Sequence, residues 1–359
     1  MQGERPVFVH SMFRTGSTYV WAVLRRSGAV WAYYEPLSDY FLERGMDLIG
    51  DKEVSRRVAM AHRHPGVNAP YMLEYAETVS AGGAAFKETF PVELAFLSAT
   101  QECRDLKDYI GRLLGNAKRR PSLHFCRSVF RSDWLHATFD AARIYLWRNI
   151  RDQWLSSKIH PYFVASILML ANSGGRWREV ADVARALHIP SCRGVDYGEE
   201  MALYQAAGYG MSAEHSFVLL YCLWALAFIV NVPKADVVIA MDRLSDDVEY
   251  RGEVSARLEE CGVGGVDMSD CNCHRSVLDD GERGWFDEAE HAAKALLEQC
   301  GVRPADIGAL PDWTRLNEEL GSQPLARERR AARAAEDCMR AKREAKELRL
   351  LLGRLSAEA

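Results

Sequence analysis

The sequence predicts an α/β protein whose central sheet is parallel. Short apolar runs rich in β-branched and aromatic residues alternate along the chain with helix-like stretches. This alternation is typical of parallel strands joined by helices that cover both faces of a sheet. The four predicted strands lie within residues 5–12, 29–37, 141–149 and 235–244.

The first predicted unit is a strand, a short polar turn and a helix. Residues 5–12 read RPVFVHSM, and the amphipathic stretch after the turn ends near Gly28, a residue type that often ends helices. The second strand ends at Pro36. The two later strands each follow a helix-like segment, residues 132–140 and 217–232.

Three stretches of interest lie at the carboxyl ends of predicted strands. They are residues 13–18, 33–37 and 147–157. Because the carboxyl ends of parallel strands meet at one edge of a sheet, and ligands bind at that edge, we expect one site to contain all three stretches.

Composition and charge limit the class of protein. The 359 residues are 48% hydrophobic and 26% charged, as in a folded globular protein. A formal net charge of −5 argues against a general nucleic-acid-binding protein, which needs a basic surface.

The nine cysteines contain one close pair, Cys271 and Cys273, and no secretory leader is evident. We therefore expect reduced thiols and a cytoplasmic protein. A C-x-C-H stretch ending at His274 lacks the second ligand cluster of a zinc site, so we expect no metal. The apolar run 217–232 is shorter than the ~20 residues of a bilayer span and predicts a buried helix rather than a transmembrane anchor.

We expect one α/β domain over residues 1–324. Residues 161–214 interrupt the strand–helix alternation and predict a mostly helical insertion, which either shapes an acceptor pocket or acts as a lid, or else only packs on the body. Residues 325–359 are rich in Ala, Arg, Glu, Lys and Leu and predict a charged helix. From Arg327 onward this helix has ten basic and six acidic residues, a net charge of +4. It either packs weakly on the body or forms a short coiled coil that makes the protein a homo-oligomer or tethers a partner.

The turn from Ser11 to Thr18 has the pattern of an anion-binding loop. A nucleotide-binding P-loop reads G-x-x-x-x-G-K-[ST] and holds phosphate with backbone amides, a helix N-terminus and a lysine. Here Ser11 replaces the first glycine and Ser17 replaces the lysine, while Arg14 is the cation and Gly16 is kept. The loop therefore predicts phosphate binding without the usual triphosphate chemistry.

No convincing acidic magnesium ligand follows a strand, although Asp242 is a nominal candidate. A phosphate loop without a metal suits a donor whose transferred group is less charged than phosphoryl, such as sulfuryl.

Two motifs together resemble the sulfotransferase family. FRTGST, residues 13–18, is similar to the family's 5′-phosphosulfate loop. RIYLWRNIRDQWLSS, residues 143–157, is similar to its 3′-phosphate motif, in which a serine follows a strand-end arginine by eight positions, as Ser156 follows Arg148. The resemblance is specific over residues 6–37 and 123–157. It implies a P-loop-type three-layer fold and the donor 3′-phosphoadenosine 5′-phosphosulfate, with no metal.

The resemblance also implies roles for these residues. The implied donor-binding residues are Arg14, Thr15, Gly16, Ser17, Thr18, Arg148 and Ser156. Arg14 would offset charge on the leaving phosphate. An arginine at a strand end can bind phosphate with a two-pronged contact, and the alternative is that Arg148 and Arg151 pair with Asp152 or with helix ends.

Glu35 is the candidate catalytic base. It ends the second strand, and YYEPL is similar to the Y-x-E-P region of carbohydrate sulfotransferases, where a glutamate is the proposed base. The alternative is a glutamate that fixes the turn at Pro36 or pairs with an arginine. The cytosolic small-molecule branch of the family uses histidine instead, so His124 is the second candidate, whereas His10 lies inside an apolar strand and is expected in the core.

Other cations are candidates for the acceptor side. Lys87, in a segment similar to bacterial sulfotransferases, faces the acceptor or donor, or else forms a surface pair with Glu88. Arg127 and Arg131 share one face if their stretch is helical, and bind an anionic acceptor or the donor phosphates, or pair with acidic neighbours. The R-K-G tripeptide of the cytosolic branch is absent, and Arg283–Gly284 or residues 274–276 are the alternatives for closing the 3′-phosphate site.

The sequence therefore predicts a sulfotransferase acting on a hydroxyl of a carbohydrate, a glycosylated compound or another secondary metabolite. One alternative is a P-loop small-molecule kinase. The other is a non-catalytic, sulfotransferase-like scaffold that binds a nucleotide or sugar while its basic tail recruits partners. No sugar, phenol or lipid motif occurs in the insertion that would identify the acceptor.

Overall fold

The fold is described from a computed structural model of the chain. It describes residues 4–44, 70–81, 86–276 and 278–313, and the single positions 52, 316 and 320. The charged helix predicted for residues 325–359 lies outside the described residues, so its structure and its self-association stay predictions.

Five parallel strands form one sheet in the order β2-β3-β1-β4-β5. The strands are β1 (Val7–His10), β2 (Val30–Tyr34), β3 (Arg120–Phe125), β4 (Ala142–Trp147) and β5 (Val237–Ala240). The predicted α/β class and parallel sheet are confirmed, and all four predicted strands are present. Because β1 pairs with both β3 and β4, the turn that follows it lies in the middle of the carboxyl edge.

The strand β3 is the one that hydropathy did not predict. Its sequence, RPSLHF, contains a proline, a serine and a histidine, yet its last four residues are buried. Ser122 and His124 are enclosed because β3 pairs with β1 on one side and β2 on the other. Pairing within the sheet, rather than a local apolar run, makes this segment a strand.

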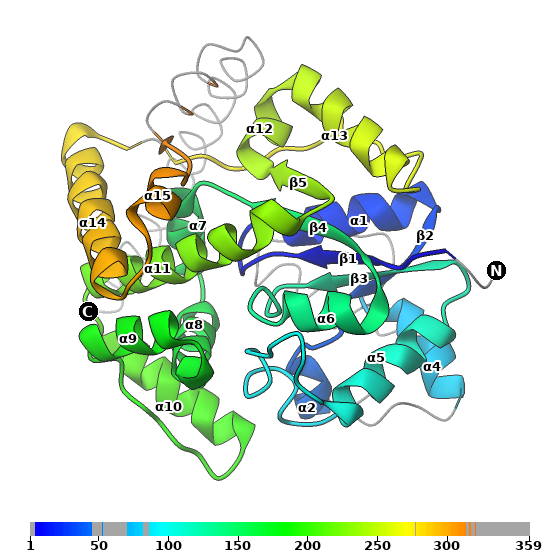
Figure 1. The fold of residues 1–359 in the computed structure, drawn as a ribbon, viewed down its shortest axis with the longest axis horizontal. Coiled ribbons are helices and arrows are strands. Elements are labelled where there is room, and N and C mark those ends of the chain that lie inside the picture. The colour runs from blue at the N-terminus through cyan, green and yellow to red at the C-terminus, as the bar shows by residue number, and fades with distance from the viewer. Residues whose placement is uncertain are drawn as a thin grey trace, which may run out of the picture.

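Helices surround the sheet on both sides (Figure 1). Those before β4 are α1 (Ser17–Ser27), α2 (Tyr40–Arg44), α4 (Ala76–Ser80), α5 (Arg104–Gly115) and α6 (Ser132–Phe139). Those after β4 are α7 (Ile150–Ser157), α8 (Pro161–Ser173), α9 (Arg178–Ala186), α10 (Tyr197–Gly210), α11 (Ala213–Asn231), α12 (Met241–Asp246), α13 (Val248–Glu260), α14 (Asp280–Gln299) and α15 (Pro304–Gly308). Gly28 caps α1 in the left-handed conformation, as the sequence predicted.

The segment 161–214 contains α8, α9 and α10, which are grouped on the side of the sheet where the strands end (Figure 1). Helix α10 packs closely on α8: a Cβ atom added at Gly208 would lie 3.0 Å from Cγ1 of Val164. The buried residues of these helices belong to the same apolar cluster as those of α11. The insertion is therefore packed into the body and lies beside the edge where a ligand is expected.

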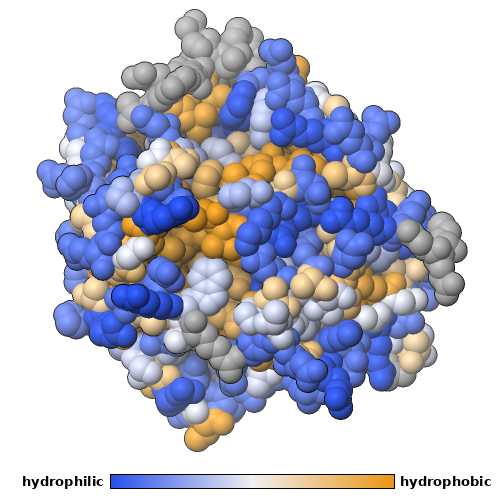
Figure 2. All heavy atoms as spheres, viewed as in Figure 1, coloured by the Kyte–Doolittle hydropathy of each residue, from blue (hydrophilic) through white to orange (hydrophobic). Residues whose placement is uncertain are grey.

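Helix α11 begins four residues earlier than the apolar run predicted, at Ala213. Together with the turn that follows it, to Lys234, this helix is long and apolar enough to cross a membrane by length and composition. The expectation that the segment is too short for a bilayer span was therefore wrong. Within the protein, however, 72% of the most apolar 18-residue part of this helix is buried, as is usual for the core helices of soluble proteins. Figure 2 shows apolar areas between largely hydrophilic ones on this face of the protein.

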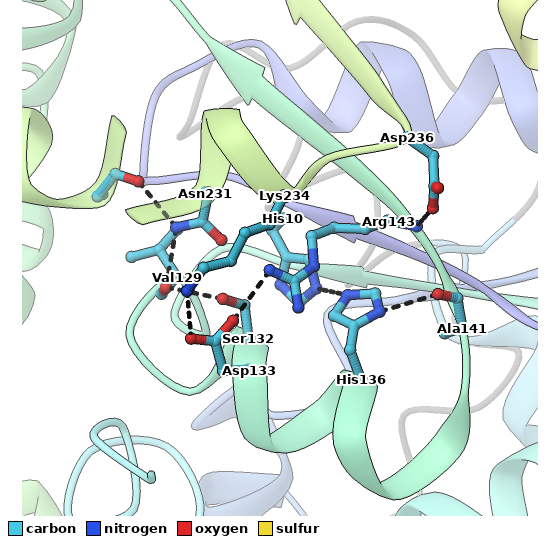
Figure 3. A network of polar contacts seen from close by, with 11 residues as sticks. His10, Val129, Ser132, Asp133, His136, Ala141, Arg143, Asn231, Lys234 and Asp236 are labelled. Atoms are coloured by element: carbon cyan, nitrogen blue, oxygen red, sulfur yellow. Dashed lines mark hydrogen bonds and ion pairs between the residues drawn. The ribbon is translucent and has the colours of Figure 1, made fainter. Parts of the chain in front are cut away.

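A buried histidine pair joins the end of β1 to α6 (Figure 3). His10 is fully buried, and its Nε2 lies 3.0 Å from Nε2 of His136, whose Nδ1 lies 2.9 Å from the carbonyl oxygen of Ala141. A carbonyl oxygen only accepts, so Nδ1 of His136 donates to it and its Nε2 accepts from His10. Both rings are neutral in this arrangement, and His10 belongs to the core, as expected.

Candidate functional site

The turn between β1 and α1 forms the floor of the candidate site. Two of its residues have positive φ angles, Arg14 at 63° and Gly16 at 102°, and Gly16 is the N-cap of α1. No side chain caps this helix end and its first turn contains no acidic residue. The helix N-terminus therefore keeps its partial positive charge and its amide donors for an anion.

The hydroxyl groups of this turn are held by the protein. Thr15 donates to the carbonyl oxygen of Met12 at 2.8 Å. The Ser17 Oγ lies 3.2 Å from the Cys126 Sγ, and the Thr18 Oγ1 lies 3.1 Å from the Tyr34 hydroxyl. Each of these hydroxyl groups thus has a partner within the protein.

Residues from two of the predicted segments, 13–18 and 147–157, meet beside the turn. The Arg14 Nε donates to Ser156 Oγ at 2.9 Å, and the Arg148 Nη1 donates to the Arg14 carbonyl oxygen at 3.3 Å. Arg148 is 6% exposed, and its Nε is buried without a hydrogen-bond partner. The structure therefore brings together Arg14, Arg148 and Ser156, which are separated by up to 142 positions in the chain.

The segment 274–276 closes over Arg148. The Arg148 guanidinium donates to the carbonyl oxygen of His274, and Arg275 donates to the carbonyl oxygen of Asp242 at 3.3 Å. The Arg275 side chain is 8% exposed and paired with Asp246, but its Nε and Nη1 have no hydrogen-bond partner. Two buried guanidinium groups with unsatisfied N–H donors lie in one neighbourhood, which favours an anionic ligand there.

The alternative closing residues lie elsewhere. Arg283 is in the first turn of α14, where it is half-exposed and pairs with Asp280. Arg151, the other arginine near Arg148, pairs with Asp287 and Glu290 of α14 at 2.6 Å each. Arg151 therefore forms ion pairs, as the alternative prediction had it. Arg148, in contrast, donates to carbonyl oxygens and, among the residues that the structure describes, to no carboxylate.

Asp242, the nominal magnesium ligand, is part of the same buried region. Its Oδ2 accepts from the backbone N–H of Asn149 at 2.6 Å. Burial raises the pKa of its carboxyl to about 6, while the charge of Arg148 acts in the opposite direction. Asp242 thus supports the start of α7 and the Arg148 side chain. In the part of the chain that the structure describes, no cluster of three metal-ligating side chains is found.

Three hydrogen bonds to backbone carbonyl oxygens hold the turn that contains Glu35. Its φ angle is 39°, which is uncommon for a residue with a side chain. The carbonyl oxygens on either side of it, of Tyr34 and Pro36, accept from the hydroxyls of Tyr75 at 2.9 Å and Tyr109 at 2.7 Å. Its own carbonyl oxygen accepts from the Ser38 N–H at 2.9 Å. Surrounding structure that holds a strained residue in place is frequent at functional sites.

The Glu35 carboxyl is linked to the turn between β1 and α1 through Cys126. It is hydrogen-bonded to Cys126, whose sulfur lies within hydrogen-bond distance of Ser17. Burial raises the pKa of Glu35, and the positive charge of Arg127 and the hydrogen bond to Cys126 partly oppose that shift. A glutamate with a raised pKa beside an anion site is suited to proton transfer.

A buried polar group near Glu35 combines one predicted residue, Arg127, with three that the sequence did not predict. We call it the Asp39 cluster; its members are Asp39, Arg127, Tyr162 and Tyr197. The Asp39 Oδ1 accepts from Arg127 at 2.6 Å and from the Tyr162 hydroxyl at 2.8 Å, and Oδ2 accepts from the Tyr197 hydroxyl at 2.7 Å. The side chains of Asp39 and Arg127 are each 4% exposed. Arg127 therefore pairs with an acidic neighbour, which was one of the predicted alternatives to a ligand-binding role.

Three predicted residues lie apart from these contacts. Arg131 is not on a helical face with Arg127; it precedes α6, is fully buried and donates to the Phe90 carbonyl oxygen at 2.8 Å. Burial lowers the pKa of Arg131 to about 9, and the charge of Arg127 adds to this. His124 is enclosed within β3, and burial lowers its pKa to about 3.

Lys87 is at the surface. Its Nζ pairs with Asp105 at 2.5 Å, and the two side chains are 47% and 60% exposed. The partner is Asp105 rather than the predicted Glu88, whose carboxylate accepts from the backbone N–H of Tyr197.

Comparisons of the chain with protein-family models, with curated proteins and with solved structures found no match.

Proposed function

We propose that this protein is a sulfotransferase with a P-loop-type three-layer fold, which transfers a sulfuryl group from 3′-phosphoadenosine 5′-phosphosulfate to a hydroxyl. The observation that carries the proposal is the meeting of Arg14, Arg148 and Ser156 at the uncapped start of α1. The Glu35 carboxyl is linked to the same turn through Cys126. The cytoplasmic location expected from the sequence is part of this proposal.

In this proposal the two phosphate groups of the donor bind to different parts of the site. The amides at the start of α1 and the Arg14 side chain hold the 5′-phosphosulfate. Arg148, Arg275 and Ser156 hold the 3′-phosphate, because the two arginines have buried N–H donors without partners. Arg275 thereby takes the place of the missing R-K-G tripeptide.

Glu35 is the proposed general base. Its carboxylate takes the proton from the acceptor hydroxyl as that oxygen forms a bond to sulfur and the bond from sulfur to the phosphate oxygen breaks. Arg14 and the helix N-terminus stabilise the charge that develops on the leaving phosphate. Burial keeps the Glu35 pKa above its usual value, which brings its basicity closer to that needed near neutral pH.

The proposed acceptor is a hydroxyl of a carbohydrate, a glycosylated compound or another secondary metabolite. The insertion lies beside Glu35, since Tyr162 of α8 and Tyr197 of α10 reach the Asp39 cluster. Arg127 is neutralised there by Asp39, so we expect an acceptor without a negative charge next to the reacting hydroxyl.

The kinase alternative has less support from the site. Serine occupies the position of the P-loop lysine. Asp242, the nominal magnesium ligand, accepts from the Asn149 N–H. The hydroxyls of Ser17 and Thr18 contact Cys126 and Tyr34 instead.

The experiment is calorimetric titration of the protein with adenosine 3′,5′-bisphosphate, with and without magnesium. We expect binding that does not need magnesium and that Arg148→Ala weakens by about 2 kcal/mol, the cost of a charge-assisted phosphate contact. Arg283→Ala is the matched control, because Arg283 is half-exposed on α14, and should bind like the wild type.

Magnesium-dependent binding of ATP, without binding of the bisphosphate, would contradict the proposal and favour the kinase. Bisphosphate binding without transfer to any hydroxyl acceptor would favour the scaffold. Thermal unfolding of each variant checks that a loss of binding is not a loss of folding.

A further inference from the structure

The Asp39 cluster joins segments that are far apart in the sequence. Asp39 follows the Glu35 turn directly, and Arg127 follows β3. Tyr162 is the second residue of α8, and Tyr197 is the first residue of α10. One buried carboxylate thus binds the first turn of two insertion helices, in addition to a buried arginine.

The backbone of the cluster is continuous with the Glu35 turn. The hydrogen bond from the Ser38 N–H to the Glu35 carbonyl oxygen closes the turn one residue before Asp39. The charges of Arg127 and Asp39 both act on the Glu35 carboxyl, the first favouring its ionised form and the second opposing it. A displacement of Asp39 would therefore move Glu35 and change its surroundings.

The cluster also contacts the anion-binding turn. The Arg127 guanidinium lies 5.1 Å from the centre of the Phe13 ring, and Phe13 packs edge-on against Tyr162 and Phe163 of α8. The Arg14 guanidinium lies 4.8 Å from the centre of the Phe163 ring. The start of α8 therefore packs on the same turn that is proposed to hold the donor.

We propose that the Asp39 cluster is a latch that holds the first turns of α8 and α10 against the Glu35 turn, and that Asp39 is thereby a positioning residue for Glu35. While the latch is closed, the insertion encloses Glu35 beside the anion-binding turn. The role of Glu35 as base rests on the proposed function, whereas the mechanical coupling between the insertion and the Glu35 turn does not.

The test uses tyrosine-to-phenylalanine variants of the full chain. Asp39→Asn would leave Arg127 buried without its carboxylate and disturb folding, so it is not the primary variant. Tyr197→Phe and Tyr162→Phe each remove one hydroxyl and no charge. Tyr204→Phe is the matched control, because Tyr204 is also a buried tyrosine of α10 but its hydroxyl accepts from the Cys192 N–H.

The first measurement is hydrogen–deuterium exchange of the Ser38 amide, which reports on closure of the Glu35 turn. We expect Tyr197→Phe to speed this exchange by about 5-fold, in line with the loss of one hydrogen bond, and Tyr204→Phe to leave it unchanged. Amides of the central strand β1 report global stability and should keep their protection in both variants.

The second measurement is the titration of the Glu35 side-chain carboxyl carbon by NMR, assigned with Glu35→Gln. Opening of the latch admits water, so in Tyr197→Phe the raised pKa should fall toward the usual glutamate value. A hydrogen bond with a merely structural role would not move this titration, and Tyr204→Phe should not move it.

Unchanged Ser38 exchange and an unchanged Glu35 titration in Tyr197→Phe and Tyr162→Phe would overturn the latch. Equal effects of Tyr197→Phe and Tyr204→Phe would also overturn it, because they would show a general loss of stability. Failure of the proposed function is seen separately, as absent binding of adenosine 3′,5′-bisphosphate to a wild type whose exchange behaviour follows the latch.

Discussion

Glu35 has a backbone conformation that is costly for a residue with a side chain, and the protein holds it there with hydrogen bonds to three successive carbonyl oxygens. A glutamate needed only to start the turn at Pro36 could be replaced by glycine or asparagine, which adopt positive φ angles more readily. The combination of strain, partial burial and a link through Cys126 to the turn after β1 is instead what a positioned carboxylate base requires.

We predict that Glu35→Gln lowers the rate of sulfuryl transfer by about 10²- to 10⁴-fold, the usual contribution of a general base. The amide has nearly the shape of the carboxyl group but cannot accept the proton, so the affinity for adenosine 3′,5′-bisphosphate should stay unchanged. Single-turnover kinetics measure the rate of transfer from the donor, and calorimetric titration measures the affinity for adenosine 3′,5′-bisphosphate. An unaffected rate would assign the base to another group.

The pH dependence of the reaction follows from the same residue. Because burial raises the Glu35 pKa, the active ionised form is lost as the pH falls through a value above that of an ordinary glutamate. We expect kcat/KM to decrease on the acid side with a midpoint above about 4.3, the usual glutamate value. A pH–rate profile with its midpoint at or below that value would be inconsistent with Glu35 as the base.

At the scale of elements, the turn between β1 and α1 depends on Gly16. Its φ angle of 102° is one that side chains rarely adopt, and a Cβ atom there would lie 3.0 Å from the Met241 Cε. Gly28, at the other end of α1, also has a positive φ angle, but its nearest atom, Nη1 of Arg119, is 3.8 Å away. The two glycines thus differ in the space around them.

We predict that Gly16→Ala lowers the free energy of unfolding by about 2 kcal/mol and Gly28→Ala by about 1 kcal/mol, since both strain the backbone and only the first also crowds a neighbour. Gly16→Ala alone should weaken binding of adenosine 3′,5′-bisphosphate. Urea denaturation and calorimetry measure these effects. Equal losses of binding in the two variants would show that the turn has no special role.

At the scale of the whole molecule, the histidine pair at the end of β1 links stability to pH (Figure 3). Burial and the nearby Arg143 lower the pKa of His136 to about 4, and burial and His136 lower that of His10. An unfolded histidine has a pKa near 6.5, so between pH 6.5 and 4 the unfolded chain binds more protons than the folded chain. The stabilisation is therefore complete above pH 6.5 and is lost as the pH falls toward 4.

We predict that the free energy of unfolding decreases by roughly 3 kcal/mol for His136 over this range. His136→Gln should be less stable at pH 8 but should show a shallower decrease between pH 6.5 and 4. His215→Gln is the control, because His215 is exposed on α11. Urea denaturation at several pH values measures the slopes, and identical slopes for His136→Gln and the wild type would contradict the prediction.

The pattern of apolar runs was enough to predict the parallel sheet, because four of its strands are buried on both faces and therefore have continuous apolar sequences. It was also enough to predict which side chains follow the strand ends. The topology then brings Arg14, Glu35, Arg148 and Ser156 to one edge, as expected for parallel strands.

Tertiary structure alone decided what local patterns do not encode. The strand β3 has polar residues that become buried only through pairing with its neighbours. Arg148 could have paired with Asp152, but the fold places it against carbonyl oxygens and beside Arg275, which lies 127 positions away.

The Asp39 cluster is the clearest example of this limit. Its partners lie 88, 123 and 158 positions from Asp39, so no spacing in the sequence relates them. A buried carboxylate needs hydrogen-bond donors from wherever the fold supplies them, and that supply exists only once the insertion has packed on the sheet. The chain's local patterns determined the elements and the ends of the strands, whereas packing at long range determined which side chains meet there.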